Sequence, residues 1–124
     1  MDRRYRLKKS RDFQRVRNSG KAYTHPFFVL IYAPNSSSQT RIGVAAGRSI
    51  GNAVKRNRAK RRLRASIQPW IPQLAPGIDI VLIARKALLT ASFSHLSQAL
   101  EKALKSNQIV MDVNHACQTD TRNS

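Results

Sequence analysis

Acidic residues are scarce in this sequence, and the few present form no recognisable catalytic pattern. The chain of 124 residues has 6 Asp and Glu residues against 23 Lys and Arg residues, a formal net charge of +17. It has no paired-carboxylate motif, nucleophile elbow or glycine-rich phosphate loop, and Asp79 stands alone at the start of an apolar segment. The polypeptide therefore shows no catalytic centre of its own, and the charge imbalance favours a polyanionic partner.

Cysteine and long apolar runs are also nearly absent. The single cysteine, Cys117, permits no intrachain disulfide, and neither it nor the scattered histidines have metal ligands at useful spacing. The longest apolar run, residues 27–33, is far shorter than a membrane span, and no apolar stretch follows the basic N-terminus as in a signal peptide. We therefore expect a cytoplasmic protein that binds no metal ion alone and does not enter a membrane.

The positive charge that is present is concentrated in one half of the chain. Residues 1–64 hold 18 of the 23 Lys and Arg residues. A solvated surface would spread charge, whereas a nucleic-acid-binding surface or a disordered arm concentrates it. The 41% hydrophobic content and the chain length indicate one folded domain. We expect a basic arm over residues 1–9 that orders only against a partner, a domain over 10–106, and a polar, flexible tail over 107–124.

The hydrophobic pattern predicts helices alternating with strands. The expected helices cover residues 10–20, 52–67 and 92–106, and the expected strands cover residues 22–33, 40–47 and 78–84. Turn residues at 34–39 favour an antiparallel hairpin between the first two strands. In the first strand, Phe27, Val29 and Ile31 alternate with a second apolar set, so one face packs on helices. The other face is either a second packed layer or an open floor for a ligand.

The densest signal is the helix expected over residues 52–67. Seven of the ten residues 55–64 are Lys or Arg, and no acidic residue lies between 55 and 67. On a helical wheel, Ala59, Leu63 and Ile67 form a buried stripe that Trp70 continues. The outward arc carries Lys55, Asn57, Arg58, Lys60, Arg61, Arg62 and Arg64. Phosphates would relieve the uncompensated repulsion between these cationic side chains. The arc therefore predicts that the helix binds a polyanion, either DNA or RNA.

Aromatic residues give a weaker indication. Phe13 and Phe27 are candidates for stacking on unpaired bases, as single-strand binders require. An aromatic side chain in a small domain is nevertheless more often part of the core. Periodicity alone leaves both alternatives open.

Several segments resemble the bacterial ribonuclease P protein subunit. The resemblance is strongest in residues 41–44 and in residues 50–61, where Arg56, Asn57 and Arg58 match the RNR signature of that family. Residues 7–16 and 77–85 also match, in the right order. The resemblance implies an α+β fold, an α-β sandwich in the order αβββαβα. Its mixed sheet would have about four strands with a left-handed βαβ crossover, and Pro26 would divide the first strand to supply the fourth.

The same resemblance implies a function. The protein would assemble with the catalytic RNA of ribonuclease P and aid removal of the 5′ leader from precursor tRNA. Mg²⁺ held mainly by the RNA subunit would perform hydrolysis, none would be bound by the protein alone, and no obligate protein partner is expected. The RNR helix, with Arg56, Asn57, Arg58, Lys60, Arg61 and Arg64, would lie near the RNA subunit and the cleavage site, and Lys55 and Arg62 complete the predicted RNA-binding set.

The resemblance also implies a cleft for the leader against the open sheet face. Phe13 would line it and contact the single strand, with Phe27 as a further aromatic candidate. This chain has Arg17 where family members often have a second aromatic residue, and Ile31 where a tyrosine is common. Gly47-Arg48-Ser49 replaces the more usual Ser-Lys-Lys, so Arg48 is carried over as a backbone contact. The predicted leader path is thus less aromatic and more electrostatic.

Two other functional classes remain as alternatives. A structural rRNA- or DNA-binding protein would use the same basic helix to neutralise phosphates without a role in turnover. A cationic membrane-active polypeptide is disfavoured because the apolar stripe of the helix is narrow and is needed for the core.

Overall fold

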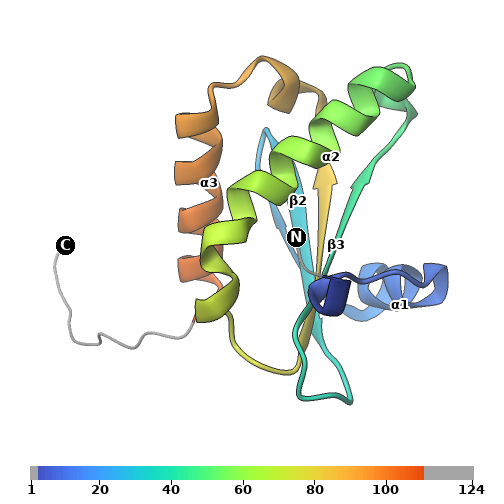
Figure 1. Cartoon of the computed structure of the whole chain (residues 1–124), viewed down its shortest axis with the longest axis vertical. Coiled ribbons are helices and arrows are strands. Elements are labelled where there is room, and N and C mark those ends of the chain that lie inside the picture. The colour runs from blue at the N-terminus through green and yellow to red at the C-terminus, as the bar shows by residue number, and fades with distance from the viewer. Residues whose placement is uncertain (1–2, 111–124) are drawn as a thin grey trace, which may run out of the picture.

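The computed structural model describes residues 3–110 and contains one four-stranded sheet with helices on both faces (Figure 1). The α-helices are α1 (Ser10–Ser19), α2 (Ala53–Ile67) and α3 (Phe93–Ser106), and the strands are β1 (Lys21–Thr24), β2 (Phe28–Pro34), β3 (Arg41–Ala46) and β4 (Ile78–Ala84). The remaining elements are short 3-10 helices: η1 (Arg3–Tyr5), η2 (Arg48–Ile50), η3 (Gln68–Gln73) and η4 (Lys86–Thr90). The expected αβββαβα order is confirmed.

The division of the first predicted strand is also confirmed. β1 and β2 are antiparallel neighbours, and the backbones of His25 and Phe28 exchange hydrogen bonds of 2.9 and 3.2 Å across the turn between them. Pro26 occupies this turn, where its missing N–H costs no ladder bond. The fourth strand therefore arises by breaking one apolar segment.

The expected hairpin between the first long strand and residues 40–47 is wrong. The strand order is β1-β2-β4-β3, so β4 lies between β2 and β3, antiparallel to β2 and parallel to β3. The physical reason lies in β4, whose residues Ile80, Val81 and Leu82 are all 0% exposed. A strand that is apolar on both faces belongs in the middle of a sheet, and the connection at residues 35–40 is long enough to step over it.

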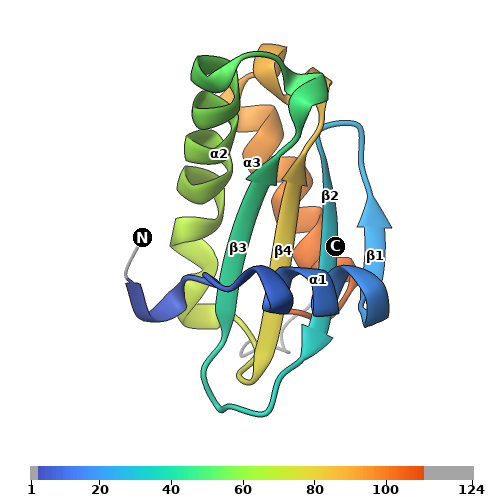
Figure 2. The ribbon, with the colours of Figure 1, turned by 90° about the vertical axis from the view of Figure 1, so that its right-hand side faces the viewer.

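The connection from β3 through α2 to β4 has the implied unusual hand. With α1 toward the viewer, β3 and β4 both point upward, β4 lies to the right of β3, and α2 lies on the far side (Figure 2). Such a crossover is left-handed, against the strong general preference for the right hand.

The sheet separates two hydrophobic clusters. Phe28 and Leu30 of β2 point into the larger cluster beneath α2 and α3, whereas Ile31 and Ala33 join the smaller cluster beneath α1. The period of two along β2 thus places both apolar faces as expected. Between them, the clusters fix α1 on one face of the sheet and the cationic helix on the other.

Both ends of the domain are more closely attached than the sequence suggested. The expectation that residues 1–9 order only against a partner does not describe residues 3–9, because Leu7 is 4% exposed and its N–H donates to Ile42 O at 2.8 Å. The free edge of β3 provides this backbone partner. At the other end, Ile109 is 1% exposed and its carbonyl accepts from Ala75 N at 2.7 Å. Residues 111–124 of the expected tail lie outside the described residues.

Candidate nucleic-acid interface

Helix α2 has the predicted apolar and cationic sides. Asn52 caps it by accepting a 3.0 Å hydrogen bond from Lys55 N. Ala59, Leu63 and Ile67 are each 0% exposed, as the helical wheel predicts. The helix therefore presents a fixed outward face rather than a flexible basic segment.

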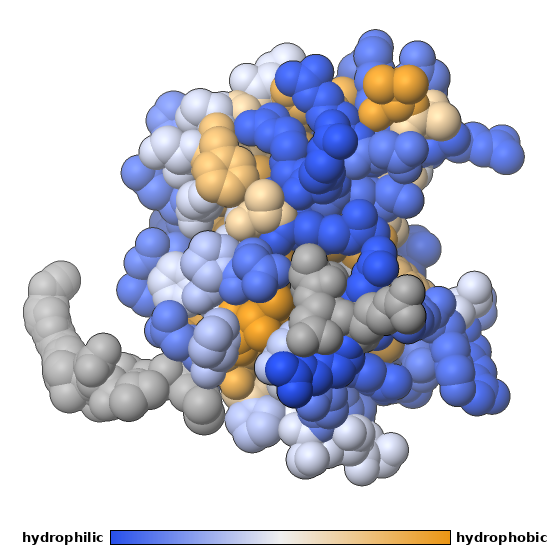
Figure 3. All heavy atoms as spheres, in the orientation of Figure 1, coloured by the Kyte–Doolittle hydropathy of each residue, from blue (hydrophilic) through white to orange (hydrophobic). Residues whose placement is uncertain are grey.

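The outward face of α2 is cationic and largely free of counter-ions. Lys55, Asn57, Arg58 and Arg61 are exposed, and Lys60 is half-buried. Among residues 3–110, no carboxylate lies within ion-pair distance of any α2 side chain. The surface over α2 is accordingly hydrophilic along most of the helix in the space-filling view, apart from an apolar patch where the helix begins (Figure 3). Uncompensated positive charge of this kind is what a phosphate backbone neutralises.

Arg62, which was predicted to contact RNA, also makes hydrogen bonds within the protein. Its guanidinium donates to the carbonyl oxygens of Leu88, at 2.6 Å, and of Ala91, both at η4. The C-terminal end of a 3-10 helix leaves backbone carbonyls with free hydrogen-bonding capacity, and Arg62 reaches two of them from α2. Nη1 and Nη2 of Arg62 thus both contact backbone carbonyls, and the side chain links α2 to η4.

Two further α2 arginines are partly engaged with the protein. Arg56 donates from Nη1 to Gly51 O at 2.8 Å and so braces the turn that precedes the helix. Arg64 is half-buried, and its Nε has no hydrogen-bond partner. Burial, and then the nearby positive charge of Arg6, lower the pKa of Arg64 from its ordinary value. An anion near Arg64 and Arg6 would offset their mutual repulsion and favour the charged form of Arg64.

On the opposite face of the sheet, α1 covers only part of the strands (Figure 2). The half-buried side chains of Val29 on β2, Ile83 on β4 and Ala45 on β3 are in register with one another on this face, beyond the row that contains Gly43. They form an apolar row, which we call the sheet floor. Phe13 of α1 lies over Gly43, the neighbouring row of the same sheet face. An open apolar surface therefore lies beside an aromatic ring.

The sequence alone missed Ala45 and Ile83 as members of this surface. Strand alternation is the signal that finds them, because Val29 was already placed on this face and the other two are its lateral neighbours. That inference needs the strand order, which local patterns did not supply.

The structure brings together only some of the predicted cleft residues. Phe13 and Arg17, one helical turn apart on α1, line a common shallow hollow, and Arg48 is exposed in η2 just after β3. Ile31 is 7% exposed within the smaller cluster, so it supports the surface from below rather than lining it. Phe27 packs against the larger cluster, because the turn at Pro26 removes it from the alternation of β2.

The sequence suggested that Asp79 stands alone, but the structure places it at the centre of a charged cluster. Its carboxylate is 0% exposed and accepts two 2.9 Å hydrogen bonds from Arg41, one from Nε and one from Nη2. Arg15 of α1 and Asn35 also donate to it. Hydrogen bonding to Asp79, more than its charge, raises the pKa of Arg41. These partners come from segments far apart in the sequence, so local patterns could not find them.

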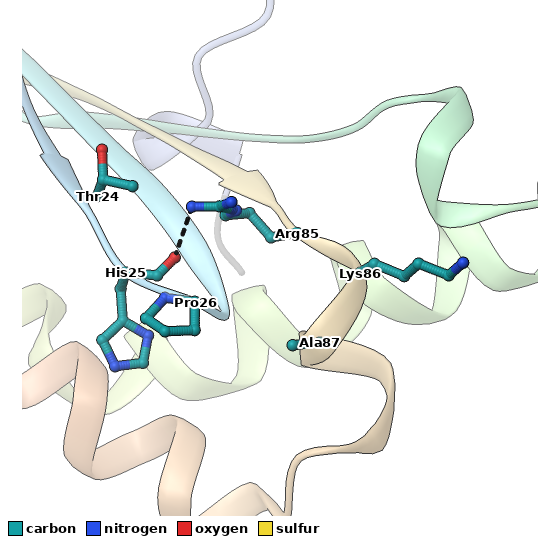
Figure 4. A pocket seen from close by; sticks show the side chains of 6 residues that line it. All are labelled: Thr24, His25, Pro26, Arg85, Lys86 and Ala87. Carbon is teal, nitrogen blue, oxygen red and sulfur yellow. Dashed lines mark hydrogen bonds between the residues drawn. The ribbon is translucent and has the colours of Figure 1, made fainter.

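A second hollow lies where β1 and β4 end. Its lining consists of Thr24, His25, Pro26, Arg85, Lys86 and Ala87 (Figure 4). Arg85 Nη1 donates to His25 O at 3.5 Å, which ties the end of β4 to the turn before β2. The exposed cations Arg85 and Lys86 extend the positive charge to this end of the sheet.

Comparison with known proteins shows to which family the chain belongs. Residues 1–108 match the ribonuclease P family. The chain is a member of that family. The ribonuclease P protein component of Herpetosiphon aurantiacus is 37% identical over 120 residues, covering 97% of this chain and 98% of that protein. That of Caldanaerobacter subterraneus is 38% identical over 100 residues, covering 81% and 86%.

Solved structures agree with this family membership. The ribonuclease P protein of Staphylococcus aureus superposes with a TM-score of 0.76 at 30% identity, covering 86% of this chain and 97% of that one. The Thermotoga maritima protein gives a TM-score of 0.72 at 30% identity over 82% and 96%. The chain is thus the protein subunit of a ribonucleoprotein endoribonuclease that matures tRNA 5′ ends, with an RNA subunit as partner.

Within this ribonuclease P protein, the described residues offer no fit for a divalent cation. No group of three or more His, Cys, Asp or Glu side chains in residues 3–110 converges on a common point. The two carboxylates that come near each other, Asp12 and Asp79, both face Arg15 and Arg41, and these guanidiniums already occupy the oxygens that Mg²⁺ would need.

No helix in the described part of the chain has the length and apolar character to cross a bilayer.

Proposed function

We propose that the two faces of this ribonuclease P protein bind two different RNAs. The outward face of α2 contacts the RNA subunit, and the sheet floor with Phe13 and Arg17 takes the 5′ leader of precursor tRNA. The observation that supports this division is the position of the two surfaces: α2 and α1 pack on opposite faces of one sheet. Hydrolysis is left to Mg²⁺ held by the RNA subunit, since the described residues lack a ligand set.

For the RNA subunit, the chemistry of α2 favours contacts with the phosphate backbone. Lys55, Arg58 and Arg61 are exposed cations on one rigid helix, and Arg56 and Lys60 lie beside them. Arginine forks bind phosphate oxygens in a planar, bidentate manner. Release of counter-ions from RNA would then supply much of the affinity, which should fall steeply with salt concentration.

For the leader, the sheet floor suits unpaired nucleotides. A flat apolar row beside an aromatic ring can stack bases without reading their sequence. Arg17, which lines a hollow together with Phe13, and Arg48, beyond the end of β3, supply charge for the phosphates. A surface of this kind binds single strands of any sequence, as a leader-binding surface must if leaders differ.

Reconstitution tests the assignment of the two surfaces. The protein is combined with a bacterial ribonuclease P RNA at low Mg²⁺, and binding and cleavage are measured for precursor tRNA with a long leader and with a single-nucleotide leader. Phe13→Ala should weaken binding of the long-leader substrate by about 5- to 100-fold and spare the short one. Phe93→Ala is the matched control, because Phe93 is 47% exposed on α3 and is not among the residues proposed to contact RNA.

Three outcomes separate the alternatives. Loss that is confined to the long leader supports the proposal. Equal loss for both substrates would contradict the leader contact and indicate a general effect on RNA binding. Unchanged binding of the long leader by Phe13→Ala would place the leader elsewhere on the protein.

A further inference from the structure

We propose that Asp79 is a positioning residue: through Arg15 and Arg41 it holds α1 at the angle that places Phe13 and Arg17 beside the sheet floor. The proposal rests on the leader-binding surface proposed above. It assigns a role in substrate binding to a buried carboxylate that touches no RNA.

The carboxylate of Asp79 is saturated with hydrogen bonds from three segments of the chain. Oδ1 accepts from Arg41 Nε at 2.9 Å and from Asn35 Nδ2 at 2.8 Å. Oδ2 accepts from Arg41 Nη2 at 2.9 Å and from Arg15 Nη2. A carboxylate with 0% exposure is costly unless its oxygens are paired in this way, so the geometry around it is restricted.

Helix α1 supplies the other half of the cluster. Arg15 also donates to Pro34 O at 3.3 Å, at the end of β2. Asp12, one turn earlier on α1, lies 3.6 Å from Arg41 Nη1 and 3.9 Å from Arg15 Nε. The cluster therefore links α1 to β2, β3 and β4 at once.

Apolar packing alone attaches α1 weakly. Val16 is the only residue of α1 that is buried, and Phe13 is half-buried. Phe13 also packs over Gly43 and against the smaller cluster, but two apolar side chains oppose rotation of the helix less than a broad buried stripe would. The ionic cluster supplies the missing constraint.

The spacing along α1 connects the cluster to the leader surface. Asp12 and Arg15 share the face toward Asp79, while Phe13 and Arg17, four residues apart, share the neighbouring face. Rotation of the helix would move both pairs together. Fixing Arg15 on Asp79 and Asp12 on Arg41 therefore fixes the position of Phe13 and Arg17 on the neighbouring face of the helix.

Arg15→Gln is the variant that tests this, because it removes the direct link from α1 to Asp79 and leaves the Arg41–Asp79 pair intact. The 3.6 Å pair of Asp12 with Arg41 then remains as the one ionic link from α1 to the cluster among the described residues. Its side chain is 39% exposed, so the fold should survive, which circular dichroism and thermal melting check. Arg11→Gln is the matched control: Arg11 is exposed on the same helix, and no carboxylate of the described chain pairs with it. The two variants lose the same charge.

We expect Arg15→Gln to weaken binding of the long-leader precursor to the holoenzyme by about fivefold relative to Arg11→Gln. Binding of the single-nucleotide-leader substrate, affinity for the RNA subunit and the rate of cleavage at saturating substrate should stay unchanged. Arg15→Lys, which keeps the charge and one hydrogen bond, should recover part of the loss. In Phe13→Ala, the further change Arg15→Gln should add little, because the ring that it positions is gone.

The outcomes distinguish this proposal from the one on which it rests. If Phe13→Ala weakens long-leader binding and Arg15→Gln matches Arg11→Gln, α1 needs no positioning by Asp79 and only this proposal is overturned. If Arg15→Gln weakens both substrates equally, its role is general and the proposal is also overturned. If Phe13→Ala has no effect on the leader, the leader surface itself is misplaced.

Discussion

The ring of Phe13 lies so close to Gly43 that a Cβ atom at position 43 would come within 2.3 Å of Phe13 Cζ. Phe13 belongs to α1 and Gly43 to the middle of β3, so the absence of one side chain allows the helix to approach the sheet. The distance between α1 and β3, and with it the shape of the proposed leader surface, depends on this glycine.

Gly43→Ala is therefore expected to displace Phe13. Because the neighbouring atoms belong to a packed ring, the added methyl group should destabilise the fold by about 1–3 kcal/mol, measured by urea unfolding. Per folded molecule, long-leader binding should also weaken.

Gly47→Ala provides the control for this substitution. Nothing lies within 4 Å of a Cβ at Gly47, so stability and leader binding should both remain near those of the wild type. Equal stability of the Gly43 and Gly47 variants would show that Phe13 moves aside freely.

Leu63→Ala should separate folding from RNA binding. Leu63 is 0% exposed beneath α2, so its truncation should cost about 2–5 kcal/mol of unfolding free energy, with RNA affinity per folded molecule preserved. Val54→Ala, at a side chain that is 75% exposed on the same helix, should change stability little. A negligible shift in the melting temperature of Leu63→Ala would contradict the buried stripe.

Arg58→Ala should weaken binding to the RNA subunit without affecting the fold. Arg58 is exposed on α2, so we expect the slope of log affinity against log salt concentration to become shallower by about one unit. Lys102→Ala, at an exposed cation on α3, should leave the slope unchanged. An unaltered slope for Arg58→Ala would mean that this side chain meets no phosphate.

Arg62→Ala should behave differently from Arg58→Ala, although both remove one α2 arginine. Arg62 holds the carbonyls of Leu88 and Ala91, and its loss should destabilise the protein by about 1–3 kcal/mol. The salt dependence of RNA binding should change less than in Arg58→Ala. A full unit of change with unaltered stability would show that Arg62 leaves η4 to bind phosphate.

His25 should make stability depend on pH. Burial, and then the charge of Lys102, lower the pKa of His25 below its ordinary value of 6.5. Its Nδ1 accepts a 3.0 Å hydrogen bond from Phe27 N, which the protonated ring cannot do. Since the unfolded chain binds this proton more readily, stability is complete above about pH 6.5 and falls as the pH is lowered from there.

His25→Asn is the matched variant for this effect. Asparagine can accept from the N–H two residues on but does not titrate, so the neutral-pH stability should be largely kept and this part of the pH dependence lost. The check is urea unfolding at about pH 7.5 and about pH 5.5 for both proteins. Identical pH dependence in the two would rule out His25 as its source.

Much of this protein could be predicted from local pattern. The buried stripe of Ala59, Leu63 and Ile67 follows from the 3.6-residue period, because a helix turns the same positions inward wherever it packs. The two apolar faces of β2 follow from its period of two. Charge counting alone led to the prediction that α2 binds a polyanion, and the RNR match indicated the family of the chain.

Strand neighbours and long-range partners required the tertiary structure. The hairpin expected before β3 does not form, because β4, more than thirty residues later in the chain, takes the central place beside β2. Asp79 looked isolated because Arg15 and Arg41 reach it across 64 and 38 residues. Period and composition act between neighbours in sequence and so determine elements and their faces. Which strand edges and which charges meet depends on how both apolar faces of the sheet can be covered at once, and only the folded chain decides that.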